Sequence, residues 1–404
     1  MTRRRLRAAL VAAAIALLAP AAARGAPPAV VAQQAILLQP QTGDVILRRA
    51  ADAERPVAST TKLMTALLVL ERAKLDDVFT AVPYEAQAAE SRINLKAGER
   101  MSVRDLLRAL LLESANDAAA TLAVGVSGSQ AAFVGEMNAR ARELGLRHTA
   151  YANPIGLDEP GNHSSARDLV KLTRRLRTNA FFRRTVAMRS ASLTTGDHAR
   201  QIENTNDLLG RPPGVNGVKT GHTLEAGYVL VGSATRGRVN VLSVVLGDPG
   251  VAARDADTLA LLRYGLSLYR EVPIVQLDRV LASARVKYRE EDRIELVPAR
   301  RVLKILRRGE RPRATVSAKE VLEGPLPRGA VAGSVTVRVR GRVVARVPLV
   351  TAQPVPKVSL AERAVDFAFK PSTLAVIFLV AAAGAGLFLW LHRRRRAKDQ
   401  VPAP

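Results

Sequence analysis

The stretch Ala58-Ser-Thr-Thr-Lys-Leu-Met-Thr65 opens an apolar run that continues to Leu70. Pro56 just upstream, the hydroxyl residues and the helix formers after them are typical of the beginning of a helix. Because residues three apart lie on one face of a helix, we expect the Ser59 hydroxyl and the Lys62 amine to lie side by side. A lysine that is neutral part of the time could take the serine proton and activate a nucleophile. A capped helix with a solvated lysine fits the same pattern, so the rest of the chain must decide.

The N-terminus has the three parts of a secretory signal peptide. Residues 1–23 combine a basic start, an apolar run from Ala8 to Leu18 and small residues at the end. Ala21-Ala22-Ala23 is the expected cleavage site, because cleavage after Ala26 would leave Pro27 behind the cut. The alternative is a retained membrane anchor.

The C-terminus contains a predicted transmembrane helix. Ser372–Leu391 is a run of 20 residues without a charge, and a helix of that length spans roughly 30 Å, the thickness of the hydrocarbon core. Four arginines follow at 393–396, so the positive-inside rule predicts a cytoplasmic tail and places everything before Lys370 outside. A buried core helix is the alternative, but no further domain follows that could enclose it.

Composition limits the partners and the chemistry. The 404-residue chain contains no cysteine, which excludes disulfides, thiolate metal sites and a thiol nucleophile. Lys and Arg outnumber the acids by 61 to 36, for a net charge of +25. An exported protein with spread-out basic residues and 4% aromatics is not expected to bind nucleic acid. Anionic envelope polymers or lipid head groups are the expected partners of this charge, unless it reflects genomic composition.

The first 270 residues alternate between strand and helix patterns. Two short apolar runs around Gln41-Thr-Gly-Asp44 predict a β-hairpin, and β-branched runs between 215 and 246 predict antiparallel strands. A helical block lies between them, and a helix over 255–269 follows. This order indicates an α+β fold in which the first hairpin and the last strands share one sheet.

Capping residues mark the helices of the block. Ser102 with Asp105 three residues later predicts one N-cap, and Ser164 or Ser165 predicts another. Between them, Asn116 or Asp117 is expected to cap an alanine-rich helix.

The second half of the chain predicts a separate β domain. Alternating strands and Gly- or Pro-containing turns fill residues 272–352 and predict a small all-β sandwich. The proposed division is therefore as follows: 1–23 signal peptide, 27–271 first domain, 272–352 β-sandwich stalk, 353–371 stiff linker, 372–391 transmembrane helix and 392–404 basic tail.

Three short motifs carry the candidate chemistry. Ser59-x-x-Lys62 opens a helix, Ser114-Ala115-Asn116 lies between two helices, and Lys219-Thr220-Gly221 ends a strand. In this order and spacing the chain resembles the low-molecular-mass penicillin-binding proteins of the D-alanyl-D-alanine carboxypeptidase family, whose sites contain S-x-x-K, S-x-N and K-T-G. The resemblance covers about residues 30–270. It extends to these flanking stretches: Asn153-Pro-Ile-Gly-Leu-Asp158, Gly217-Val-Lys-Thr-Gly-His-Thr223 and, in the β domain, Glu323-Gly-Pro-Leu-Pro-Arg-Gly329.

The resemblance implies a penicilloyl-serine transferase (β-lactamase-like) catalytic domain. It implies that Ser59 attacks the penultimate D-Ala carbonyl of a peptidoglycan stem peptide ending in D-Ala-D-Ala, with Lys62 as base. β-Lactams would acylate the same serine. The family assigns proton transfer to Ser114, and contact with the lysine and the substrate amide to Asn116.

The same resemblance assigns the substrate-binding strand. Lys219 and Thr220 would bind the terminal carboxylate, and Gly221 would let the substrate approach the strand edge. The backbone N–H groups of Ser59 and His222 would form the oxyanion hole, leaving the His222 side chain incidental.

Other polar residues could have either a functional or a purely structural role. Arg254, before the closing helix, is a further carboxylate-binding candidate or else a surface arginine. Glu113 is expected to be a helix-end charge rather than a base. His148, His163 and His198 lack metal-ligand spacing, so we expect neither a metal nor another cofactor.

Three other functions remain open. A D,D-endopeptidase would cut crosslinks with the same residues. A class A β-lactamase would need a deacylating Glu after the S-x-N motif, and residues 153–163 carry Asp158 and Glu159 without the expected Glu-x-x-Leu-Asn pattern. A non-catalytic wall-associated scaffold would not require all three motifs to be intact. The signal peptide and the terminal anchor together predict a single-pass membrane protein with an extracytoplasmic catalytic domain.

Overall fold

The computed structural model describes residues 26–87, 90–369 and 371–398. The predicted signal peptide, residues 1–23, lies outside them. The chain divides into two compact units between Arg270 and Glu271, and each is described by itself.

The first unit contains a five-stranded antiparallel sheet in the order β2-β1-β9-β8-β7. The N-terminal hairpin therefore pairs with the last strand, which confirms the predicted shared sheet. Ile36 lies opposite Val244 in this pairing, as expected for β-branched residues on a buried sheet. The strands are β1 (Gln34–Gln39), β2 (Asp44–Arg49), β7 (Val215–Thr223), β8 (Gly227–Arg236) and β9 (Val239–Asp248).

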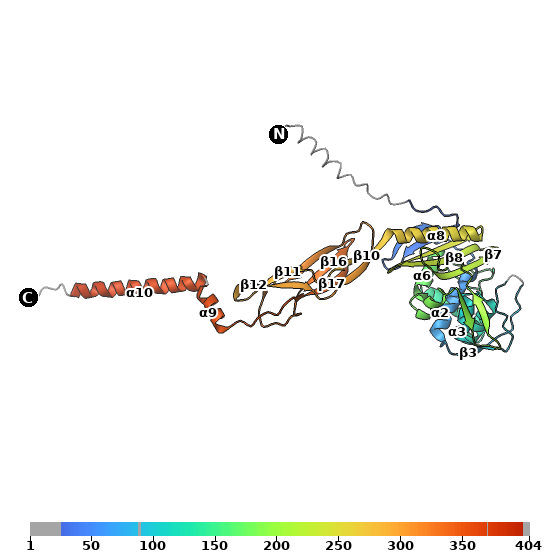
Figure 1. The fold of residues 1–404 in the computed structure, drawn as a ribbon, viewed down its shortest axis with the longest axis horizontal. Coiled ribbons are helices and arrows are strands. Elements are labelled where there is room, and N and C mark those ends of the chain that lie inside the picture. Colours follow the sequence, from blue (N-terminus) through green and yellow to red (C-terminus); the bar gives the residue numbers. More distant parts are fainter. Residues whose placement is uncertain (1–25, 88–89, 370, 399–404) are drawn as a thin grey trace, which may run out of the picture. The chain divides into compact units, whose positions relative to one another are not determined.

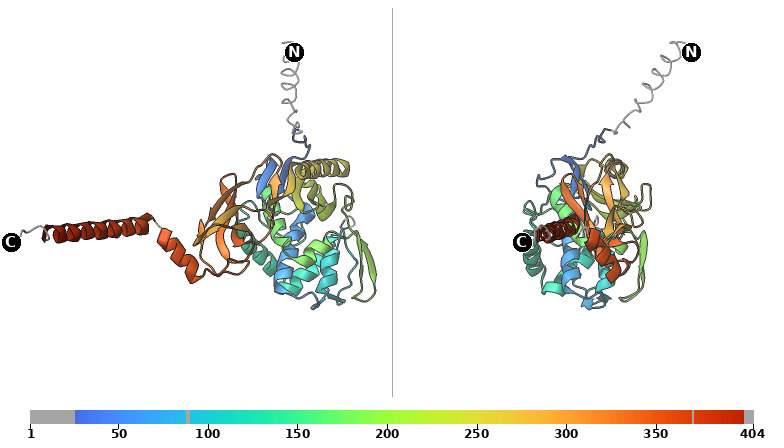
Figure 2. Two further views of the ribbon diagram at one scale, coloured as in Figure 1. Left: turned by 60° about the vertical axis from the view of Figure 1, so that its left-hand side comes forward. Right: turned by 90° about the vertical axis from the view of Figure 1, so that its left-hand side faces the viewer.

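Helices cover both faces of this sheet. Helix α8 (Val251–Leu268) packs on β8 and β9 from one face, while α6 (Ala166–Leu176) packs on β9 and β1 from the other (Figure 1). The blue N-terminal strands and the yellow helix α8 lie next to each other in both views of Figure 2, in agreement with contacts between α8 and β1.

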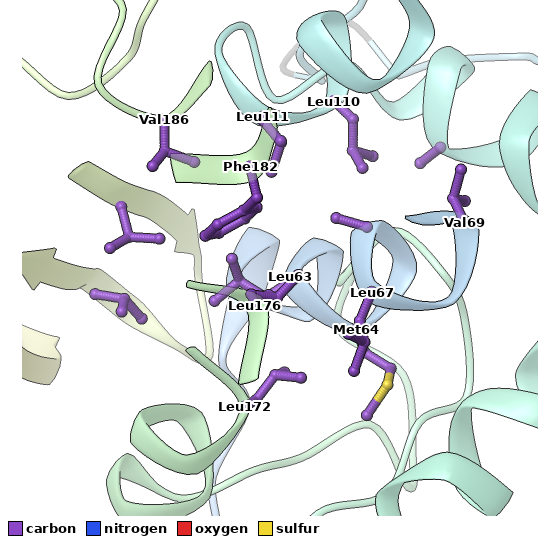
Figure 3. Packing of buried hydrophobic residues seen from close by; sticks show 14 of the residues in the cluster. Leu63, Met64, Leu67, Val69, Leu110, Leu111, Leu172, Leu176, Phe182 and Val186 are labelled. Carbon is purple, nitrogen blue, oxygen red and sulfur yellow. The ribbon is translucent and has the colours of Figure 1, made fainter. Parts of the chain in front are cut away.

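The helical block packs around α2 (Lys62–Arg72). Leu63, Met64 and Leu67 of this helix converge with leucines of α3 and α6 and with Phe182 of α7, all of them buried (Figure 3). The other helices of the block are η1 (Ala58–Thr61), α3 (Val103–Leu111), α4 (Asn116–Ser127), α5 (Gln130–Glu143) and α7 (Ala180–Thr185). The burial of these side chains in the core holds the first turn of α2 in place.

Two of the predicted helix caps are confirmed and one is wrong. The side chains of Ser102 and Ser165 accept hydrogen bonds from the N–H groups three residues on. For α4 the N-cap residue is Ala115, without a side-chain cap. Asp117 instead accepts hydrogen bonds from the N–H groups of Ile93 and Leu95, because a neighbouring segment offers its carboxylate unpaired donors.

Two short hairpins were not expected from the sequence. They are β3 (Val78–Thr80) with β4 (Arg100–Ser102), and β5 (Ser190–Leu193) with β6 (Arg200–Glu203). Their strands have three or four residues and mixed polarity, too little for a recognisable alternation.

The second unit is an all-β domain followed by helices. Six strands form a sheet in the order β14-β16-β17-β12-β11-β15, and β10 pairs with β13. Both sheets contribute to one buried core that includes Val275, Leu296 and Val335. The strands are β10 (Tyr269–Val275), β11 (Ala282–Val286), β12 (Arg289–Pro298), β13 (Val302–Arg307), β14 (Arg313–Ala318), β15 (Val321–Leu322), β16 (Val331–Val339) and β17 (Arg342–Thr351).

Two helices end the described chain, α9 (Leu360–Phe369) and α10 (Pro371–Lys398). Within α10, residues 371–394 are long and apolar enough to cross a membrane and are not buried against other parts of the structure. This helix contains the predicted span 372–391 and is a candidate membrane anchor.

A buried carboxyl pair in the first unit predicts a pH-dependent stability. Asp248 is 1% exposed, and neither of its oxygens accepts a hydrogen bond from the described residues. Burial and the neighbouring Asp257 raise the pKa of Asp248 to about 7, against the opposing charges of Arg254 and Arg55. Because this pKa lies above the unfolded value of about 3.9, stability falls as the pH rises between the two.

We therefore expect Asp248→Asn to raise the melting temperature of the first unit at pH 8 by a few degrees. The gain should shrink towards pH 4, where the wild-type carboxyl is protonated. Scanning calorimetry at both pH values measures it. The exposed Asp207 supplies the control, Asp207→Asn, which should change neither value. A gain that is equal at pH 4 and pH 8 would contradict the assignment.

Candidate active site

Ser59 and Lys62 meet where η1 joins α2. The Lys62 amine lies 2.9 Å from Ser59 Oγ and donates to the Ile155 carbonyl at 2.7 Å. Ser59 is partly exposed, whereas Lys62 is fully buried. The predicted contact between the hydroxyl and the amine is confirmed, and a solvated lysine is excluded.

The surroundings of Lys62 favour its neutral form. Burial, followed by the charge of Lys219, lowers the pKa of Lys62 well below its ordinary value. The carboxylates of Glu90 and Asp117 act in the opposite direction. An amine with a lowered pKa can accept a proton from a hydroxyl at neutral pH.

Ser114 and Asn116 lie at the turn between α3 and α4. Ser114 adopts a φ of 66°, and its buried Oγ has no hydrogen-bond partner among the described residues. Asn116 Nδ2 donates to Glu90 Oε2 at 2.6 Å. The Ser114 backbone therefore lies in the left-handed region, which is strained for a residue other than glycine. Its hydroxyl is available for a further hydrogen bond.

Strand β7 carries the third motif beside η1. Lys219 is 1% exposed, and its amine donates to the Thr220 carbonyl at 3.1 Å. Burial and the charge of Arg254 lower the pKa of Lys219 to about 7, although Glu113 opposes this. The Thr220 hydroxyl is bonded to that of Thr205 at 2.6 Å.

The next two residues of β7 differ in exposure. A Cβ at the buried Gly221 would lie 2.9 Å from Ser59 N, so the strand passes directly beside the serine backbone. The exposed His222 ring stacks on Tyr228 with 4.1 Å between ring centroids. The stacking shows where the His222 side chain lies and leaves its backbone N–H as the group that the resemblance assigns to the site.

Arg254 is not a surface residue. It is 5% exposed, lies in the first turn of α8 and pairs with Asp255 at 2.8 Å. The positive charge of Arg254 lowers the pKa of Lys219, so Arg254 acts on the site through the Lys219 amine.

Two further participants were missed from the sequence. Glu90 bonds Asn116, and the Ile155 carbonyl holds Lys62. Both come from irregular segments with no spacing signal, although Ile155 lies within the stretch Asn153–Asp158 that carries part of the family resemblance.

No cluster of three or more His, Asp or Glu side chains suited to a metal ion occurs in the described residues. His148 and His163 both contact Glu54, at 3.2 and 3.4 Å. A serine bonded to a buried lysine whose pKa is lowered is instead typical of serine acyl-transfer enzymes that use a lysine base.

Comparison with known proteins identifies the family. The family model described as D-alanyl-D-alanine carboxypeptidase matches residues 21–250, and that of the penicillin-binding protein 5 C-terminal domain matches residues 269–357. The chain belongs to the D-alanyl-D-alanine carboxypeptidase family and is a serine-type D-Ala-D-Ala carboxypeptidase.

Curated relatives and solved structures agree with this. The chain is 31% identical to D-alanyl-D-alanine carboxypeptidase DacF of Bacillus subtilis over 79% of this chain and 84% of the relative. It is 33% identical to DacD of Escherichia coli over 82% and 89%. Penicillin-binding protein 6B of Escherichia coli superposes with a TM-score of 0.62 at 29% identity, over 82% of this chain and 98% of that one. The fold is therefore the penicilloyl-serine transferase fold with a C-terminal sheet domain.

The close approach of β7 predicts a severe effect of one methyl group. In Gly221→Ala the new Cβ would lie 2.9 Å from Ser59 N and 2.8 Å from Val229 Cγ2, displacing the strand from the serine. We expect D-Ala release and penicillin acylation to slow about 100-fold, as for loss of one oxyanion donor. Gly135→Ala, where nothing lies within 4 Å, is the matched control. Acylation at the wild-type rate in Gly221→Ala would contradict the close approach.

Proposed function

We propose that this enzyme removes the terminal D-Ala from peptidoglycan stem peptides through an acyl-enzyme on Ser59. The 2.9 Å contact between Lys62 Nζ and Ser59 Oγ, with the amine buried, carries this proposal. Neutral Lys62 takes the hydroxyl proton as Ser59 Oγ bonds to the penultimate D-Ala carbonyl carbon. The backbone N–H groups of Ser59 and His222 stabilise the oxyanion.

The leaving group needs a proton, and we propose that Ser114 relays it, which its unbonded hydroxyl supports. The Ser114 hydroxyl gives its proton to the departing D-Ala amine and regains one from the Lys62 ammonium. The carbon–nitrogen bond breaks, and the acyl-enzyme remains with Lys62 neutral again. A water then attacks the ester, its proton passing to Lys62 and from there back to Ser59 Oγ, which restores the enzyme.

The substrate carboxylate would bind along β7. Lys219 in its charged form and Thr220 are the carboxylate ligands, and Gly221 leaves room for the peptide. Because the pKa of Lys219 is about 7 in the free enzyme, binding of an anion raises it and keeps the amine charged. Arg254 adds positive charge behind Lys219.

The same acylation step accounts for penicillin binding. A β-lactam would be opened by Ser59 and remain attached to it as an ester. Glu159 is the candidate for the deacylating acid that a β-lactamase would need. It is exposed and accepts a hydrogen bond from Asn153 Nδ2 at 2.8 Å.

The membrane topology is part of the proposal. Cleavage of the signal peptide and the cytoplasmic arginines after α10 would leave the catalytic domain outside the membrane, raised by the β domain at 272–352. The substrate polymer lies on that side. Recovery of the chain in an alkaline wash without detergent would contradict an integral anchor.

The purified full chain in detergent tests the activity. We expect release of D-Ala from diacyl-Lys-D-Ala-D-Ala and a stable fluorescent penicillin adduct on the peptide that contains Ser59, located by mass spectrometry. Muropeptide digests separate loss of D-Ala from crosslink cleavage, which would instead indicate an endopeptidase. Rapid nitrocefin turnover, or no D-Ala release, would overturn the proposal.

A further inference from the structure

The segment before α3 is fastened to the beginning of α4. Asn116 N donates to the Ser91 carbonyl at 2.8 Å. The N–H groups of Ile93 and Leu95 donate to the Asp117 carboxylate at 3.2 and 2.9 Å. These bonds join residues more than 20 positions apart and hold the segment against the S-x-N motif.

Glu90 lies in this segment and is bonded through both carboxylate oxygens. Its Oε2 accepts from Asn116 Nδ2 at 2.6 Å and from the Tyr84 hydroxyl, and its Oε1 accepts from Gln87 N at 3.0 Å. Burial would raise the pKa of Glu90, but the hydrogen bonds from Tyr84 and Asn116 outweigh it, so the pKa is lowered. Glu90 is therefore an anion at neutral pH.

An anion bonded to Nδ2 fixes the orientation of the Asn116 amide. A flipped amide would turn Oδ1 towards the carboxylate and place two acceptors together, which is unfavourable. The bonded orientation therefore keeps Asn116 Oδ1 turned away from Glu90.

The negative charge of Glu90 also raises the pKa of Lys62, the proposed base. Among the charged groups that act on Lys62, Lys219 favours the neutral amine, while Glu90 and Asp117 favour the ammonium. Asp117 is bonded to the backbone of Ile93 and Leu95, whereas Glu90 is bonded to Asn116, a residue of the site itself. Glu90 thus links the two motifs.

We propose that Glu90 is a positioning residue of this active site, which fixes the Asn116 amide through its hydrogen bond to Nδ2 and adds negative charge to the surroundings of Lys62. The inference rests on the proposed function of Ser59 and Lys62. It assigns a role to a residue outside the three motifs.

Two substitutions separate the hydrogen bond from the charge. In Glu90→Gln the side chain keeps its shape and an acceptor oxygen for Asn116 Nδ2, but loses the charge. The pKa of Lys62 then falls further, so the acid limb of the pH profile of kcat/KM should move to lower pH by about half a unit or more. In Glu90→Ala the amide also loses its fixed orientation, and kcat/KM should fall at least about 10-fold.

The matched control is Glu85→Gln, which removes the same charge from an exposed position on the same segment. Its profile should coincide with that of the wild type. The pH dependence of the acylation rate by fluorescent penicillin gives the same comparison without the deacylation step. Melting curves show whether Glu90→Ala is folded, and Glu90→Gln retains the hydrogen-bond acceptor in any case.

The outcomes are distinct. An acid limb that moves in Glu90→Gln but not in Glu85→Gln supports the inference. Coincident profiles for wild type, Glu90→Gln and Glu85→Gln, together with an unchanged kcat/KM in a folded Glu90→Ala, overturn it. If the wild type itself releases no D-Ala and takes up no penicillin, the proposed function has failed instead.

Discussion

Ser59→Ala is expected to release no D-Ala and to take up no fluorescent penicillin. Among the described residues, the hydroxyl bonded to the Lys62 amine is that of Ser59, at 2.9 Å. Alanine offers no atom that can form the ester. Loss of a nucleophile costs about 10⁶-fold in kcat in serine peptidases, because the remaining groups act through it.

The fold should tolerate this change. Ser59 is partly exposed, and the buried core under α2 is formed by other residues such as Leu63 and Met64. The melting temperature should therefore stay close to that of the wild type. Ser190→Ala, at an exposed serine of β5, is the matched control and should label fully. Labelling of Ser59→Ala at the wild-type rate would show that another residue is acylated.

The contact between the Ser59 and Lys62 side chains could be predicted from their spacing in the sequence. The stretch over Ala58–Thr61 is a 3-10 turn rather than the start of the α-helix, but residues three apart align even more closely in a 3-10 turn. Likewise, the β-branched runs at 215–246 predicted the sheet strands, because a buried strand needs little beyond its own pattern.

The hydrogen-bond partners of Asn116 and Lys62 could not be predicted from local sequence patterns. Glu90 and Ile155 reach these two side chains from segments 26 and 93 residues away, and neither segment has a helical or strand period. The N-cap of α4 failed for the same reason, since Asp117 is bonded to a distant backbone. Local propensity is outweighed wherever a tertiary partner offers a better hydrogen bond.

Lys62→Met should slow acylation severely while preserving the fold. Methionine has a similar length and no proton acceptor, so Ser59 keeps its place but loses its base. We expect kcat/KM for D-Ala release to fall about 10³–10⁴-fold, the upper range for a general base. Lys96→Met, at an exposed lysine, is the control and should leave kcat/KM unchanged.

The stability of Lys62→Met distinguishes a base from a structural cation. Burial holds the pKa of Lys62 below its unfolded value, so the unfolded chain binds the proton more tightly and wild-type stability falls as the pH drops below about 10.4. Methionine cannot bind a proton, so the melting temperature of the variant relative to wild type should rise as the pH is lowered from 9 to 6. Calorimetry at both pH values measures this difference. A relative melting temperature that falls at pH 6 would mean that the buried amine is charged and paired, and Lys62 could then not serve as the base of Ser59.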